Sequence, residues 1–112
     1  MLNLIFRERW CVDKDKGIIQ NNINGLFLLR CCVSPGCVTM VSLRTNVEYG
    51  YGWEFKKIKG NQYYILAKKI IRDTVQKALQ VYLDETNNVY KASTFDFDEK
   101  NAFQVWNLIP GN

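Results

Sequence analysis

A chain of 112 residues, 47% of them hydrophobic and 23% charged, has the size and composition of one globular domain and is not typical of a disordered segment. Its apolar runs are too short for a membrane-spanning helix, and its first residues lack the order of a secretory signal. The net charge of +4 is modest. We therefore expect a single domain over residues 1–112 without a membrane span, and a cytoplasmic location if the chain is full length.

The chain contains no histidine, which removes the commonest general base from it. A Ser-His-Asp triad, a Cys-His pair and a His-ligated metal site all need that residue. Asp96 and Asp98 are the best candidates for a pair of catalytic carboxylates, but they lie in a charged segment that reads as solvated. Glycine loops of the phosphate-binding types are missing. We expect a non-catalytic protein that needs no cofactor.

The four cysteines are Cys11, Cys31, Cys32 and Cys37, and they leave three interpretations open. If Cys31 and Cys32 lie in a strand they point to opposite faces, so a shared metal ion is disfavoured and we expect no metal site. A disulfide between Cys32 and Cys37 would fit an oxidising compartment. Buried reduced thiols are the third interpretation.

The first half of the chain is predicted to form strands and turns. Leu2–Val12 is a plausible opening strand. Leu26–Val33 and Cys37–Leu43 are rich in branched residues and flank the turn sequence Ser34-Pro35-Gly36, which predicts a hairpin.

A second hairpin and two further strands are predicted in the remainder. Trp53–Ile58 and Tyr63–Leu66 surround Lys59-Gly60-Asn61-Gln62 and form the second hairpin. Near the end of the chain, Asn88–Phe97 and Ala102–Ile109 are aromatic-rich and indicate a strand, an acidic loop and another strand.

Between these elements, Ala67–Asp84 fits two different structures. Its paired apolar residues approximate the helical period and would place one set on a single face of an amphipathic helix: Ile71, Val75, Ala78 and Tyr82. Leu79, Val81 and Leu83 also alternate with their neighbours, as the residues of a strand do. The fold class depends on this segment, because a helix here would make the protein α+β.

Internal repetition favours the β alternative. Trp53–Asn61 and Phe103–Asn112 each contain an aromatic residue, alternating polar and apolar positions and a Gly-Asn turn. The second copy follows Ala78-Leu-Gln-Val81 and the polar stretch Asp84–Asn88, and it contains Gln104-Val-Trp106. This order resembles the ricin-type β-trefoil lectins, whose repeats combine a Leu-Asp-Val-like triplet, a polar stretch and a terminal Gln-x-Trp motif.

The resemblance covers about residues 25–112 and implies an all-β, β-trefoil-like fold with an incomplete first repeat, which two chains would complete as a homodimer. It implies that Gln104 and Trp106 are structural. The sugar-binding Asp of the family, which accepts hydrogen bonds from vicinal hydroxyls, corresponds to Gln80, whose amide donates as well as accepts. Phe95 or Phe97 would supply the aromatic platform and Asn101 a polar contact. The implied function is a non-catalytic, lectin-like module that recognises carbohydrate, with a glycan or a protein as partner.

The alternative is a small basic intracellular α+β protein, with an antiparallel sheet and one amphipathic helix near residues 67–84. Its partner would be a nucleic acid or an acidic protein surface, for example as an inhibitor, because the middle of the chain is locally basic. The basic surface would consist of Lys56, Lys57, Lys59, Lys68, Lys69, Arg72 and Lys77.

Overall fold

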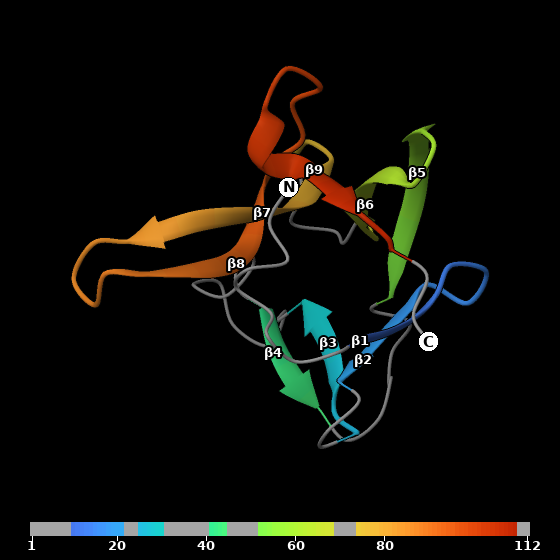
Figure 1. The fold of residues 1–112 in the computed structure, drawn as a ribbon, viewed down its shortest axis with the longest axis horizontal. Coiled ribbons are helices and arrows are strands. Elements are labelled where there is room, and N and C mark those ends of the chain that lie inside the picture. Colours follow the sequence, from blue (N-terminus) through green and yellow to red (C-terminus); the bar gives the residue numbers. More distant parts are fainter. Residues whose placement is uncertain (1–9, 22–24, 31–40, 45–51, 69–73, 110–112) are drawn as a thin grey trace.

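The computed structural model describes residues 10–21, 25–30, 41–44, 52–68 and 74–109, which form antiparallel β-sheets without an α-helix (Figure 1). The first sheet has the order β1-β2-β3-β4 and contains β1 (Trp10–Asp13), β2 (Ile18–Asn21), β3 (Phe27–Arg30) and β4 (Val41–Arg44). The second has the order β5-β6-β7-β8 and contains β5 (Trp53–Lys59), β6 (Gln62–Ala67), β7 (Lys77–Asp84) and β8 (Val89–Asp96). After the 3-10 turn η3 (Ala102–Gln104), β9 (Val105–Asn107) pairs with β6.

Both predicted hairpins are represented by paired strands. β3 pairs with β4 from Phe27 opposite Arg44 to Arg30 opposite Val41, and β5 pairs with β6 from Trp53 opposite Ala67. The connection over residues 31–40, with three of the four cysteines, lies outside the described part of the chain, as do residues 1–9 of the predicted opening strand. Cys11 is exposed on β1.

The all-β expectation is confirmed, and the alternative, a helix near residues 67–84, is wrong. Ala67 ends β6, and Lys77–Asp84 forms β7, which pairs along its whole length with β8. Leu79 and Val81 point to the same face of β7 and are almost completely buried. The alternating pattern, and not the helical one, therefore corresponds to the structure of Lys77–Asp84. Burial of each such side chain stabilises the fold by about 1.5–3 kcal/mol, which outweighs the weak helical periodicity of the sequence. Residues 69–73 are not described.

Strands β2–β5 and β6–β9 form two units whose first three strands pair in the same order. In each unit the first strand pairs with the second, through Gln20 opposite Phe27 and through Leu66 opposite Ala78. The second strand then pairs with the third, as β3 with β4 and β7 with β8. In Figure 1 the β7–β8 hairpin extends away from the other strands.

The fourth strand of each unit contributes a buried tryptophan. Trp53 Nε1 donates to the Leu28 carbonyl (2.7 Å), and Trp106 Nε1 donates to the Leu79 carbonyl (2.9 Å). Each acceptor belongs to the second strand of the same unit. The repeat predicted from sequence matched Trp53 with Phe103; the hydrogen bonds instead match Trp53 with Trp106, so the true offset differs by three residues.

One core cluster joins the two sheets. Its buried members are Ile19, Leu28, Trp53, Ile65, Ala67, Leu79, Val81 and Trp106, and Trp10 and Val12 of β1 pack against it. A smaller cluster contains Tyr64, Leu66 and Ala78, with Phe97 and Val105 packed against it. At Leu79 and Val81 the core face of β7 is therefore occupied, so a ligand beside these two residues would contact the opposite face.

Candidate functional site

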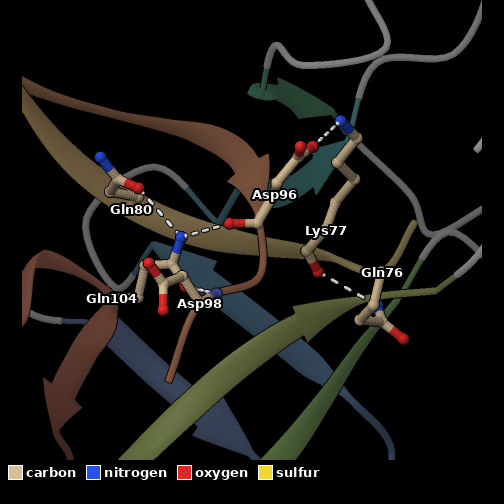
Figure 2. Close-up of polar contacts among 6 residues, drawn as sticks. All are labelled: Gln76, Lys77, Gln80, Asp96, Asp98 and Gln104. Carbon is tan, nitrogen blue, oxygen red and sulfur yellow. Dashed lines mark hydrogen bonds and ion pairs between the residues drawn. The ribbon is translucent and has the colours of Figure 1, made fainter. Parts of the chain in front are cut away.

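Three side-chain amides, those of Gln80, Asn101 and Gln104, meet beside the β7–β8 hairpin, and Figure 2 shows the contact between Gln80 and Gln104. Gln80 Oε1 accepts hydrogen bonds from Asn101 Nδ2 (3.0 Å) and from Gln104 Nε2 (2.9 Å). Gln104 Nε2 also donates to the Asp96 carbonyl (2.8 Å), and Gln104 Oε1 accepts from the Asp98 backbone N–H (2.9 Å). The structure thus brings the sequence-predicted residues Gln80 and Asn101 together, and Gln104 connects them to the backbone.

Gln104 holds this network in place because it is fully buried, with 0% of its surface exposed. Asn101 caps the 3-10 turn that carries Gln104, since its Oδ1 accepts from the Phe103 N–H (2.9 Å). The loop before the turn is fixed from β6, where the Tyr64 hydroxyl donates to the Glu99 carbonyl (3.1 Å). A buried amide whose hydrogen bonds are all made is rigid, so Gln80 is oriented before any ligand arrives.

An aromatic pair lies on the same face of the hairpin as Gln80. Residues opposite one another in an antiparallel ladder share a face, and here Gln80 is opposite Ser93 and Ala78 is opposite Phe95. Tyr82, two residues after Gln80, therefore points the same way. The rings of Tyr82 and Phe95 make an edge-to-face contact with centroids 5.7 Å apart, and Phe95 is 37% exposed.

Phe97 lies in a different environment. Its ring contacts Tyr64 edge-to-face at 4.9 Å, in the smaller core cluster, and Lys56 Nζ lies 5.6 Å from its centroid. Of the two phenylalanines named from sequence, Phe95 is thus the one beside Gln80. The sequence does not point to Tyr82 as a site residue, because the helical pattern places it with Val75 and Ala78. On a strand, Tyr82 lies two residues after Gln80 and therefore on the same face, and this spacing is the signal that identifies it.

The far end of the hairpin is held by a charged cluster at its turn. Lys91 Nζ lies 2.8 Å from Asp84 Oδ2, and the side-chain amide of Asn87 donates to the same oxygen (2.9 Å). Lys91 first, and then Asn87, lower the pKa of the Asp84 carboxyl to about 2, while Asp84 raises the pKa of Lys91. Asn88 takes the left-handed conformation (φ 53°) that lets the turn close.

The described lysines of the predicted basic surface lie in different surroundings. Lys56 and Lys57 are neighbours on β5 and point to opposite faces. Lys56 lies 3.8 Å from a Glu99 carboxylate oxygen, and Lys77 forms an ion pair with Asp96. Lys59 and Lys68 are exposed, whereas Lys69 and Arg72 lie outside the described residues.

Two further features, grouped metal ligands and a membrane-spanning helix, can be assessed in the part of the chain that the structure covers. There, no three His, Cys, Asp or Glu side chains gather as metal ligands would, and no helix is long and apolar enough to cross a membrane. Comparison of the chain with protein-family models, with curated proteins and with solved structures finds no match in any of the three. The case for a function rests on the geometry around Gln80.

Proposed function

We propose that the chain is a non-catalytic, lectin-like module that binds a glycan on the outer face of the β7–β8 hairpin. The observation that carries this proposal is the position of Gln80, which is held by the buried Gln104 on the same face as the half-buried Tyr82 and the exposed Phe95. A fixed polar group next to an aromatic surface is what sugar recognition needs, because a pyranose has an apolar C–H face and polar edges.

The repeated architecture supports a β-trefoil-like assignment. β1 pairs with β2, the first strand of the first unit, as β5 pairs with β6, the first strand of the second unit, so β1 takes the place of a fourth strand from a preceding unit. Trp10, which packs against the core from β1, then corresponds to Trp53 and Trp106. In both units a backbone hydrogen bond also reaches the residue just before the first strand, from Trp53 N in β5 to Gly17 O (2.9 Å) and from Leu108 N, just after β9, to Asn61 O (2.8 Å).

The test is a glycan array probed with the unchanged protein, with Phe95→Ala and with the matched control Tyr90→Ala. Tyr90 is on the same strand and is 51% exposed, but it is opposite Leu83 and so points to the other face. We expect Phe95→Ala to weaken glycan binding at least about tenfold, because an aromatic contact of this kind contributes roughly 1 kcal/mol beyond the area it buries. Tyr90→Ala should bind normally. An array with no signal for the folded, unchanged protein would contradict the proposal, as would full binding by Phe95→Ala.

A further inference from the structure

We propose that this site selects sugars by the carbonyl oxygen of an acetamido substituent, so that its ligands are N-acetylated sugars. The inference rests on the proposed glycan-binding function and adds the chemical class of the sugar. It follows from the polarity of the amide network, which fixes the kind of hydrogen-bonding group that Gln80 presents to a ligand.

The orientation of Gln104 is determined by the backbone. A backbone N–H only donates and a backbone carbonyl only accepts. The atom of Gln104 that contacts the Asp98 N–H must therefore be Oε1, and the atom that contacts the Asp96 carbonyl must be Nε2. Because Nε2 also contacts Gln80, it is the donor in that hydrogen bond, and Gln80 must accept there with Oε1.

Asn101 independently requires the same orientation of Gln80. The Phe103 N–H donates to one end of the Asn101 amide, which identifies that end as Oδ1. The other end is Nδ2, a donor, and its partner is again Gln80 Oε1. Two separate backbone contacts thus agree, and a flipped Gln80 would place a donor against two donors.

The remaining polar group of Gln80 is its amide nitrogen. Both lone pairs of Oε1 are used by Asn101 and Gln104, and Nε2 makes no hydrogen bond to the residues described. In Figure 2 this nitrogen points away from Gln104 and from the network. Gln80 consequently presents N–H donors and no acceptor. An aspartate at such a position would accept hydrogen bonds from two hydroxyls of a sugar, and Gln80 cannot.

An acetamido group satisfies this arrangement better than hydroxyls do. Its carbonyl oxygen is an acceptor that carries no proton, and its methyl group can pack on the Tyr82 and Phe95 rings. A hydroxyl that accepts from Gln80 still needs a partner for its own proton, and an unsatisfied donor costs about 1–3 kcal/mol when it is desolvated.

The local charge favours this neutral acceptor over a sugar carboxylate. Residues 77–107, which contain β7, β8, η3 and β9, carry five carboxylates and three lysines, a net charge of −2. Two of those lysines, Lys77 and Lys91, are already paired with Asp96 and Asp84. A uronic or sialic acid carboxylate would therefore have to compete with Asp96 or Asp84 for either of these two lysines.

The experiment compares binding of matched sugars to the unchanged protein and to Gln80→Glu. Glutamate has nearly the same shape, and one of its oxygens can accept both internal hydrogen bonds while the other replaces the outward donor with an acceptor. The probes are N-acetylglucosamine and N-acetylgalactosamine, glucose and galactose as the hydroxyl counterparts, and glucuronic acid as the carboxylate.

We expect the unchanged protein to bind the acetamido sugars at least about tenfold more tightly than their hydroxyl counterparts and than glucuronic acid. In Gln80→Glu this preference should disappear or reverse. Equal binding of acetamido and hydroxyl sugars by the unchanged protein would overturn the inference but not the glycan-binding function. A preference for glucuronic acid would overturn it too. If no glycan binds at all, the proposed function itself fails. The sugar preference of the unchanged protein tests the inference by itself, even if Gln80→Glu does not fold.

Discussion

Trp53 and Trp106 occupy equivalent places in the two units, since each donates its indole N–H to the backbone carbonyl of a leucine in the second strand of its own unit. The donor and acceptor are separated by 25 residues in one unit and by 27 in the other. The two indoles belong to the same core cluster, where they connect the fourth strand to the second in each unit. This bond is therefore the repeated element of the fold.

The first prediction follows from that equivalence. Trp53→Phe and Trp106→Phe should each lower the free energy of unfolding by about 2–4 kcal/mol, because each leaves a buried leucine carbonyl without its donor and removes core volume. Urea denaturation measures both values. Tyr90→Phe, which removes a hydroxyl at an exposed position, is the control and should stay within about 0.5 kcal/mol of the unchanged protein. An unchanged midpoint for either tryptophan variant would show that its hydrogen bond is not a structural element.

The strands around the turns were predictable from sequence, whereas β7 was not. The apolar residues of Ala67–Asp84 fit two patterns at once. Their pairs approximate the helical period, and in the second half of the segment they also alternate with polar residues as in a strand. The strand forms because β7 has a pairing partner: every residue of β7 pairs with a residue of β8, which also helps to bury Leu79 and Val81. Such a long-range pairing is not visible in a local pattern.

The candidate site was predictable one residue at a time but not as a network. The resemblance to lectin repeats named Gln80, Asn101 and Gln104, but their mutual contacts depend on where the loop before η3 returns to β7. The hydrogen bonds of the Asp96 carbonyl and the Asp98 N–H cannot be predicted from the residue types, because nearly every residue has the same backbone groups.

Gly17 and Gly60 provide a matched pair for the second prediction. Both have positive φ, 71° and 53°, so an alanine at either position costs about 1–2 kcal/mol in backbone strain. A Cβ on Gly17 would also lie 2.2 Å from the Trp53 carbonyl oxygen, whereas a Cβ on Gly60 has nothing within 4 Å. Thermal or urea denaturation should show Gly17→Ala clearly less stable than Gly60→Ala. Equal losses would mean that β5 moves away from the turn without cost.

The third prediction concerns the pH dependence of the hairpin turn. The pKa of Asp84 is lowered from 3.8 to about 2 in the folded protein, so its ion pair stabilises the fold above pH 4 and is lost as the pH falls towards 2. Carboxyl NMR of Asp84 should give a midpoint near 2. Lys91→Met removes the main cause of the shift and should raise that midpoint towards the ordinary value. A midpoint that does not change in Lys91→Met would rule out the ion pair as the cause.

The last prediction tests the polarity of the amide network through stability alone, without any ligand. Gln104 Nε2 donates two hydrogen bonds inside the protein, to the Asp96 carbonyl and to Gln80 Oε1, whereas Gln80 only accepts. Gln104→Glu would place a buried carboxylate against two acceptors and should cost about 3–5 kcal/mol, since the new charge is buried without a compensating partner. Gln80→Glu keeps an acceptor where one is needed and should cost less than about 1 kcal/mol.

The same pair of variants also differs in its response to pH. Burial raises the pKa of the new carboxyl in Gln104→Glu, so the unfolded state loses its proton at a lower pH than the folded state does. The stability deficit of this variant should therefore shrink as the pH is lowered, because a protonated carboxyl can donate one of the two missing hydrogen bonds. Urea denaturation at several pH values above 4 measures the trend while Asp84 remains ionised. If Gln80→Glu proved the more damaging of the two, the donors and acceptors of the network would be the reverse of those given above, and the preference for acetamido sugars would lose its physical basis.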